Sequence, residues 1–531
     1  MLVPNPLLPG FHPDPCICRV GEDYYLATST FEWWPGVRLF HSRDLANWQP
    51  IGYALTRRSQ LDLRGTPDSG GVWAPAITHA DGRFWLCYSE VKSLTGPYKD
   101  VCNHLVTAPS IEGPWSEPVR LNQSGFDPSL FHAPDGRKWW LNQRWEVRPD
   151  GNCFAGIVLQ EYDPGGQCLV GEPRLIFRGS SLGCTEGPHL YFRDGYHYLV
   201  TAEGGTGWEH AVTVARARDI AGPYEVSPYH PLLTANARPE CRLQKAGHGS
   251  LVEAPDGRWF LAHLCSRPVG VQRRCILGRE TALQAVVWPE GEWPRLASGD
   301  SVPADTVELP GVEAVGEAAS DAAVALPTGG LGVEWNTLRE PPDGSWLDLD
   351  SRPGWVRMRG RFSLQSTFEN SLIAVRLTAL RCTVGVTLDF APTDFQQTAG
   401  LVFYYNSRAY HALLLGWLPG VGRVLRVLSA DAMEVREVVP LGAVRPVDGP
   451  LRLEASLADG QLQFGWSRAE PGREVSTVGP VLDATVLSDD RVIETGSWGF
   501  TGCFVGLCAQ DATAAGPWAA FTNFRRTETS G

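Results

Sequence analysis

The chain has 531 residues, a formal net charge of −13 and 43% hydrophobic residues, which gives room for more than one well-packed globular domain. An acidic surface repels phosphate backbones, so nucleic acid is not expected as a partner. The sequence has no stretch of about 18 apolar residues, so no membrane span is expected. The 20 Trp, 57 Gly and 41 Pro favour short strands, many turns and aromatic surfaces over helices.

The N-terminal segment and the cysteines bear on the compartment. The segment MLVPNPLLPGFHPDP lacks a basic start and an unbroken apolar run, so a secretory signal is not expected. The 13 cysteines are odd in number and lack paired or metal-type spacing. Reduced thiols in the cytoplasm are therefore expected, with a leader that has already been removed as the alternative.

A hairpin pattern occurs five times in the first part of the chain. Each copy has a short apolar strand, a turn and an aromatic-rich strand, and the copies start at Asp14, Ala74, Asp127, Gly187 and Gly249. Four of the turns are Asp-Gly, which indicates a hairpin because a type I′ turn needs positive φ at both central residues. Units of about 55–60 residues have room for four strands. The sequence therefore predicts an all-β protein that begins with a five-bladed β-propeller over residues 1–300.

The residues that precede the first strand of each hairpin are expected to form a ring around the central channel. That ring would contain Asp14, Trp73, Asp127, Glu186 and His248, although Asp14 and Asp127 sit one position later in the repeat than the others. Three carboxylates gathered around one axis would destabilise a fold unless something used them. For any single carboxylate, capping of a turn is the alternative interpretation. Together they predict a catalytic site in the channel.

The pattern changes after the fifth repeat. Residues 301–330 are small, acidic and without strong periodicity, as expected of a linker. From residue 331 to 531, strands with alternating apolar and polar residues predict an antiparallel β-sandwich of the concanavalin-like kind. Structural support, sugar binding and a lid over the first domain are all open roles for this second domain.

Several motifs resemble glycoside hydrolase family 43, and in particular its two-domain bacterial β-xylosidases. The motifs are NPLLPGFHPDP, VWAPAI, GFDPSLF, TEGPHLY, AEGGTGWEHAVTVARA, KAGHGSLVEAPDGRWFLAHL and CILGRETAL, while AGLVFYYN and GFTGCFVGLCAQD resemble the sandwich domain of that subgroup. The resemblance implies that Asp14 is the general base, Glu186 the general acid, and Asp127 the residue that orients Glu186 and raises its pKa. It also implies inversion at the anomeric carbon, which requires the acid and base to lie about 6.5–9.5 Å apart.

The resemblance implies further contacts with the sugar. Phe31, Trp73 and Trp145 would surround the xylose ring, with packing as the alternative for each. Arg279 would hydrogen-bond sugar hydroxyls, with a surface ion pair as the alternative. Phe504 from the sandwich would close one end of the channel and so favour removal of single terminal sugars, unless it is a core residue.

His248 has two interpretations, a hydrogen-bonding histidine in the channel or a ligand of a calcium ion. One histidine is a poor basis for a calcium site, since calcium prefers several oxygen ligands. Cys16 places a thiol near Asp14, which predicts sensitivity to thiol reagents. Relatives in the family are often oligomers, so a homo-tetramer or dimer is the expectation by resemblance.

The predicted function is therefore an exo-acting, inverting β-1,4-xylosidase that releases xylose from the non-reducing end of xylo-oligosaccharides and requires no cofactor. An α-L-arabinofuranosidase or a bifunctional enzyme is the nearest alternative, because pocket shape decides between the two sugars. A non-catalytic sugar-binding propeller is the alternative from another class.

Overall fold

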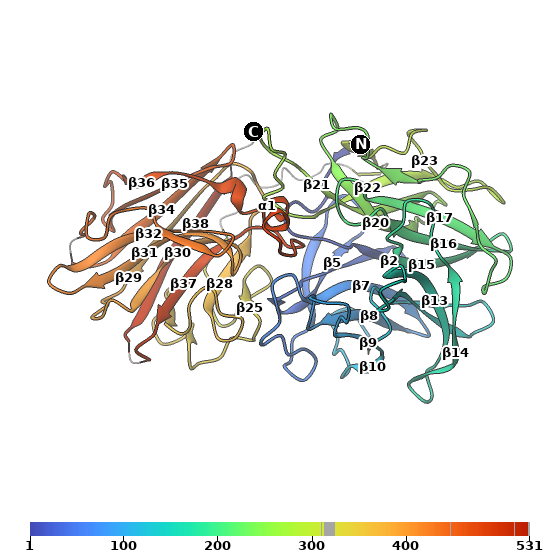
Figure 1. Ribbon diagram of the computed structural model, residues 1–531, viewed down its shortest axis with the longest axis horizontal. Coiled ribbons are helices and arrows are strands. Elements are labelled where there is room, and N and C mark those ends of the chain that lie inside the picture. The colour runs from blue at the N-terminus through green and yellow to red at the C-terminus, as the bar shows by residue number, and fades with distance from the viewer. Residues whose placement is uncertain (310, 313–323, 447, 515, 529–531) are drawn as a thin grey trace.

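The computed structural model describes residues 1–309, 311–312, 324–446, 448–514 and 516–528, which form two β-rich parts side by side (Figure 1). Among these residues, the only helical elements are α1 (Asp489–Glu494) and the 3-10 turn η1 (Ala484–Val486). Within the described part of the chain no helix has the length and apolar character needed to cross a membrane.

The first part is a five-bladed propeller, which confirms the predicted fold. Each blade is an antiparallel sheet in which strands adjacent in sequence pair with one another. The first blade contains β2 (Cys16–Val20), β3 (Asp23–Thr28), β5 (Gly36–Ser42) and β6 (Gln49–Leu55). The second contains β7 (Gly71–Ala80), β8 (Arg83–Val91), β9 (Val101–Ala108) and β10 (Val119–Asn122). The third is β11 (Ser129–His132), β12 (Lys138–Trp145), β13 (Phe154–Asp163) and β14 (Cys168–Phe177). The fourth contains β15 (Glu186–Arg193), β16 (Tyr196–Glu203), β17 (Ala211–Ala217) and β18 (Glu225–Val226), and β19 (Leu233–Thr234) also pairs with β17. The fifth contains β20 (Gln244–Glu253), β21 (Trp259–Ser266), β22 (Glu280–Val287) and β23 (Arg295–Leu296).

The Asp-Gly turns connect the first two strands of four blades, but they are of two kinds. Asp81 and Gly82 have φ of 53° and 69°, and Asp194 and Gly195 have 52° and 75°, as a type I′ turn requires. In the turns at 135–136 and 256–257 only the glycine has positive φ. There the loop is longer, and the glycine takes the left-handed position that follows a type I turn.

The start of each blade carries a residue with left-handed backbone geometry. The residues are Asp14 (φ 53°), Ala74 (34°), Asp127 (55°), Gly187 (56°) and His248 (41°). This corrects the predicted register, because His248 shares its position with Asp14 and Asp127, whereas Trp73 and Glu186 each lie one residue earlier. Non-glycine residues persist in this region only where the surrounding structure holds them, and such positions cluster at functional sites.

The propeller extends beyond its predicted end at residue 300. Within the expected linker, β24 (Thr306–Glu308) pairs antiparallel with β1 (Leu2–Pro4), so that both ends of the propeller chain meet. Val307 and Leu309 pack in the same hydrophobic cluster as Val3 and Leu8. The rest of the predicted linker includes residues 310 and 313–323, which lie outside the described residues.

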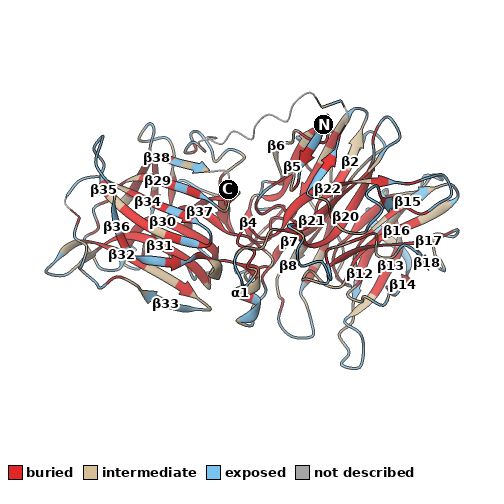
Figure 2. Ribbon diagram, turned by 90° about the horizontal axis from the view of Figure 1, so that it is seen from above, coloured by how far each residue is buried: buried red, intermediate tan, exposed pale blue. Residues whose placement is uncertain are grey.

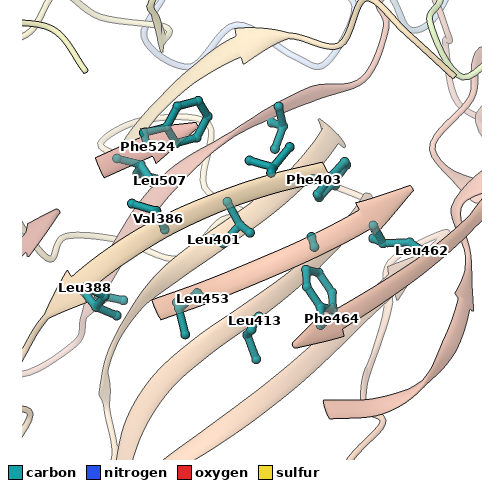
Figure 3. Close-up of a cluster of buried hydrophobic side chains, with 14 of the residues drawn as sticks. Val386, Leu388, Leu401, Phe403, Leu413, Leu453, Leu462, Phe464, Leu507 and Phe524 are labelled. Carbon is teal, nitrogen blue, oxygen red and sulfur yellow. The ribbon is translucent and has the colours of Figure 1, made fainter. Parts of the chain in front are cut away.

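The second part is a sandwich of two antiparallel sheets. One contains, in spatial order, β33 (Glu434–Glu437), β32 (Gly422–Asp431), β31 (Ala409–Leu418), β30 (Gln397–Asn406), β37 (Phe504–Asp511), β28 (Ser371–Arg376), β25 (Asn336–Leu338) and β4 (Trp33–Trp34). The other contains β26 (Leu347–Asp348), β27 (Val356–Arg359), β38 (Trp518–Glu528), β29 (Cys382–Asp389), β34 (Leu451–Ala458), β35 (Gln461–Arg468) and β36 (Ser476–Asp483). Inward-facing residues of both sheets, such as Leu401, Phe403, Leu453 and Phe464, form the core between them (Figure 3).

The two parts are joined by more than the connecting chain. Strand β4 belongs to the first propeller blade in sequence, yet Trp33 and Trp34 pair with Leu338 and Thr337 at the edge of the sandwich sheet. Both tryptophans are buried, and the buried colouring continues through the junction of the two parts (Figure 2). The sequence analysis did not predict this shared sheet.

Candidate active site

A cavity of about 710 Å³ opens where the propeller channel meets the sandwich. It is lined mainly by the propeller, with one segment of the sandwich at residues 493–500. Its lining includes the charged, polar and aromatic residues Asp14, Phe31, Trp73, Lys99, Phe126, Asp127, Trp145, Phe154, Glu186, Thr206, His248, Arg279, Trp498 and Phe500. The cavity therefore brings together all three predicted carboxylates and most of the predicted sugar contacts.

Asp14 is a buried carboxylate that is held ionised. Ser29 Oγ donates a hydrogen bond of 2.6 Å to Asp14 Oδ2, and Arg279 Nη1 donates one of 3.2 Å to Oδ1. Burial raises the pKa of Asp14, but Arg279, His248 and the Ser29 hydrogen bond together outweigh it, so that the net pKa lies below the ordinary value of 3.8. At neutral pH this side chain can accept a proton.

Glu186 and Asp127 have the opposite electrostatics. Burial, followed by the charges of Asp127 and Asp14, raises the pKa of Glu186 well above its ordinary value. Burial and Asp14 also raise the pKa of Asp127, to about 8. Two carboxyls that repel one another in a dry site retain protons at neutral pH. Glu186 is half-buried and faces the cavity, so it is placed to donate a proton.

Asp127 also holds the backbone beside Glu186. Its Oδ2 accepts a hydrogen bond of 3.1 Å from the N–H of Gly187, at the start of β15. Gly187 has no room for a side chain, since a Cβ would lie 2.9 Å from Cε1 of His248. The predicted orienting contact thus acts through the residue that follows Glu186.

Aromatic rings form the walls of the cavity. The rings of Phe31 and Trp73 lie 6.1 Å apart, and Trp73 Nε1 donates to the carbonyl of Ser69 at 2.9 Å. The ring of Phe126 contacts both other aromatic walls, with its centre 5.8 Å from that of Trp145 and 5.5 Å from that of Trp73. All three predicted aromatic residues therefore line the cavity.

Arg279 connects Asp14 to the sandwich. Besides Asp14, its Nη1 contacts Thr206 Oγ1 at 3.1 Å, while Nε and Nη2 both donate to the carbonyl of Phe500, at 3.1 and 2.9 Å. Its guanidinium also lies 5.1 Å from the centre of the Phe31 ring. This is a buried site rather than the surface ion pair that was the alternative.

The prediction for Phe504 is wrong. Its side chain is fully buried, stacks on Trp33 at 3.7 Å and does not line the cavity. The residues that close this side are Phe500 and Trp498, whose rings lie 5.6 Å apart. Phe504 is the first residue of β37 and packs between the two parts, against Trp33 and Phe11, whereas the loop before the strand carries Phe500 to the cavity.

The sequence analysis also missed Lys99. Its ammonium lies 4.5 Å from the Trp145 ring and 4.9 Å from the Trp498 ring, in the cavity wall. Burial lowers the pKa of Lys99, while Cys153 and Glu186 act in the opposite direction. Lys99 lies in the irregular segment between β8 and β9, outside the hairpin repeat, so the repeat could not point to it.

His248 lines the cavity, but the protein groups around it do not form a calcium site. Burial lowers the pKa of His248, so the ring is neutral, and its charged neighbours are Asp14 and Arg279. In the described part of the chain, the ring belongs to no group of three His, Cys, Asp or Glu side chains whose ligand atoms converge. A cation such as Arg279 beside the ring does not suit a metal that prefers several oxygen ligands.

The Cys16 thiol is less reactive than predicted. The side chain is buried against the carbonyl of Ile77, and burial raises the pKa of the thiol to about 12. Since the thiolate is the reactive form, this geometry contradicts the predicted sensitivity to thiol reagents.

An ionised carboxylate and a protonated carboxyl on one cavity of a propeller are the pair of groups that glycoside hydrolases use. Residues 3–294 match the family described as glycosyl hydrolases family 43, and residues 327–527 match the beta xylosidase C-terminal concanavalin A-like domain. The chain belongs to glycoside hydrolase family 43, as the motifs predicted.

Relatives resemble the chain over its whole length. It is 46% identical to "Xylosidase/arabinosidase 43B" of Humicola insolens, covering 98% of this chain and 97% of the relative. It is 42% identical to "Beta-xylosidase" of Bacillus subtilis (strain 168), covering 99% and 100%. Among solved structures, the xylan beta-1,4-xylosidase from Bacillus halodurans C-125 has a TM-score of 0.95 and 45% identity, covering 99% and 100%.

Proposed function

We propose that this glycoside hydrolase is an exo-acting, inverting β-1,4-xylosidase. The observation that carries the proposal is the opposite electrostatics of Asp14 and Glu186 on a single cavity, one with a lowered and one with a raised pKa. Relatives named for xylosidase activity that cover nearly the whole chain support the choice of sugar.

In the proposed mechanism, Asp14 acts as general base and Glu186 as general acid. Asp14 takes a proton from a water molecule, whose oxygen attacks the anomeric carbon while Glu186 protonates the departing glycosidic oxygen. Attack from the face opposite the leaving group inverts the anomeric centre. Arg279 keeps Asp14 ionised, and burial, together with the charge of Asp14, keeps the proton on Glu186.

Exo action follows from the closed side of the cavity. Phe500 and Trp498 form a wall opposite the propeller channel, and the carbonyl of Phe500 is fixed by two hydrogen bonds from Arg279. A xylan chain cannot pass through this wall, so only a terminal sugar reaches Asp14 and Glu186. The aromatic walls suit the apolar faces of a sugar ring.

A bifunctional enzyme is the second candidate, because a 46% identical relative is named "Xylosidase/arabinosidase 43B". Comparison of kcat/KM for nitrophenyl β-xyloside and nitrophenyl α-L-arabinofuranoside separates the two. A xyloside preference of more than about tenfold, or 1.4 kcal/mol, supports the xylosidase. A higher kcat/KM for the arabinofuranoside would overturn it.

The stereochemistry and the carboxylate roles have a direct test. A proton NMR time course on xylobiose is expected to show α-xylose as the first product, and β-xylose would overturn inversion. Asp14→Ala is expected to bind xylobiose without cleaving it. Binding without cleavage by the unaltered protein would instead favour a sugar-binding propeller.

We further propose a cytoplasmic homo-tetramer or dimer that requires no cofactor. All 13 cysteines are free, which suits a reducing compartment. Light scattering after gel filtration tests the assembly. Activity that survives exhaustive chelation, with no gain on adding calcium, is the expected result; restoration by calcium would overturn the proposal that no cofactor is required.

A further inference from the structure

The cavity wall contributed by the sandwich belongs to a segment that the propeller holds at both ends. This closing segment, residues 489–500, comprises α1 and the loop that carries Trp498 and Phe500. Figure 1 places α1 at the junction of the two parts. We propose that Lys245 and Ser69 of the propeller are positioning residues that fix this segment and thereby shape the sugar-binding cavity.

Lys245 holds the beginning of the segment. Its ammonium is buried and donates to Asp489 Oδ2 at 2.8 Å and to Asp490 Oδ1 at 2.6 Å. Asp489, Asp490 and Cys275 bring together side-chain atoms of the kind that bind metal ions. Here the Lys245 ammonium supplies the positive charge between the two carboxylates. A buried ion pair of this kind is geometrically demanding, so it fixes α1 in one position.

Other propeller contacts complete this anchor. The N–H of Cys275 donates to Asp490 Oδ2 at 2.9 Å, and Arg274 Nη2 donates to Glu494 Oε2 at 2.7 Å. Asp490 and Glu494 lie near opposite ends of α1, so the whole helix is fastened to the propeller. The residues that follow α1 enter the cavity wall directly.

Ser69 holds the end of the segment. Its hydroxyl donates to the carbonyl of Trp498 at 3.0 Å and accepts from the N–H of Phe500 at 3.1 Å. The carbonyl of Ser69 accepts from Trp73 Nε1, so one residue aligns the wall of the sandwich with the wall of the propeller. Its N–H donates to the buried carboxyl of Glu32 at 3.2 Å.

The backbone of both anchors supports a role beyond packing. Ser69 has φ of 62° and Lys245 has φ of 53°, and both side chains are buried. Non-glycine residues adopt this conformation at an energetic cost when their contacts require it. At Ser69 and Lys245 those contacts include the ones made with the closing segment, besides the backbone contacts of Ser69 with Trp73 and Glu32 and of Lys245 with His210.

The test measures the segment itself and then the cavity. Hydrogen exchange of the peptide that spans residues 489–500 is compared in the unaltered protein and in the variants Ser69→Ala and Lys245→Met. We expect exchange to accelerate by about tenfold in each variant, because two hydrogen bonds or an ion pair that restrain local opening are lost. Unchanged exchange in either variant would overturn the role of that residue.

Matched controls remove other contacts between the two parts. Tyr53→Phe removes a hydroxyl that donates to the carbonyl of Val333, and Glu334→Gln removes the ion pair with Arg38. Neither is expected to alter exchange at residues 489–500. If the controls accelerate it as much as the test variants do, the effect is general loosening and the proposal fails.

The second readout rests on the proposed function. With xylobiose, Ser69→Ala and Lys245→Met are expected to raise KM by about fivefold with kcat changed less than about twofold, since the wall binds the sugar but takes no part in proton transfer. A fall in kcat with KM unchanged would overturn the positioning role. If the unaltered protein fails to cleave xylobiose, the proposed substrate is wrong, whereas the exchange data still decide the role of the anchors.

Discussion

The raised pKa of Asp127 predicts that this residue costs stability. Asp127→Asn keeps an oxygen that can accept from the N–H of Gly187 but removes the carboxyl whose ionisation the fold opposes. The folded-state pKa is about 8 against an ordinary 3.8, so between these values the folded protein binds more protons at this site than the unfolded chain. The free energy of unfolding therefore falls as pH rises through that window.

The magnitude follows from the same shift. At pH 7, which is about three pH units above the ordinary pKa of an aspartate, Asp127 lowers the free energy of unfolding by at most ~4 kcal/mol. Each unit of pKa shift corresponds to about 1.4 kcal/mol. Asp127 interacts with Glu186, and the penalty is shared between the two. We therefore expect Asp127→Asn to stabilise the protein by about 1–3 kcal/mol at pH 7 and to be nearly neutral at about pH 4.

Differential scanning calorimetry across this pH range is the assay. The apparent Tm is compared at each pH, because a two-domain protein does not justify a two-state extrapolation. Asp14→Asn is the matched control, since it removes the other buried aspartate of the cavity but leaves Arg279 without its carboxylate. The control should lower stability at pH 7 by about 1–3 kcal/mol. A lower Tm for Asp127→Asn at pH 7, or a difference that does not vary with pH, would refute the reasoning.

Three further results are expected. Phe500→Ala should raise KM by about tenfold with little loss of stability. Phe504→Leu, which loses the stacking on Trp33, should lower the free energy of unfolding by about 1–3 kcal/mol and leave KM unchanged. Kinetics and calorimetry on both variants check this, and the opposite pattern of effects would contradict it. Iodoacetamide at pH 7 should leave Cys16 unmodified by mass spectrometry, given its burial and a thiol pKa of about 12, and rapid labelling would contradict this. Finally, kcat/KM should fall at alkaline pH as Glu186 loses its proton, and Glu186→Gln should lower kcat by about 10³-fold; activity that keeps rising to pH 10 would exclude Glu186 as the acid.

The propeller and its carboxylates were accessible from the sequence because their signals are local. The Asp-Gly turn recurs in four blades and the aromatic second strand in all five, and the spacing places Asp14, Asp127 and Glu186 at the same end of the inner strands of three blades. The predicted alignment of the five blade starts was wrong by one residue in the fifth blade. There the repeat was taken to start at Gly249, but the residue with left-handed backbone geometry is His248. Only the backbone geometry reveals that equivalence.

The residues of the sandwich that line the cavity could not be predicted from local sequence signals. Phe504 and Phe500 are four residues apart in one motif, and the turn between them decides which ring lines the cavity and which is buried between the two parts. Lys99 and Ser69 lie in irregular segments with no periodic signal. Contacts such as that between Ser69 and Trp498 join residues 429 positions apart, beyond the reach of any local pattern.

The pairing of β4 with the sandwich sheet limits how far the two halves of the chain can be separated during evolution. A gene fragment that encodes only the second half would leave β25 with a bare edge of N–H and C=O groups, which readily recruits other copies into aggregates. A fragment that encodes only the first half would expose Trp33 and Trp34 to water. Neither half is a module that recombination could transplant intact, so we expect the pair to evolve as a unit.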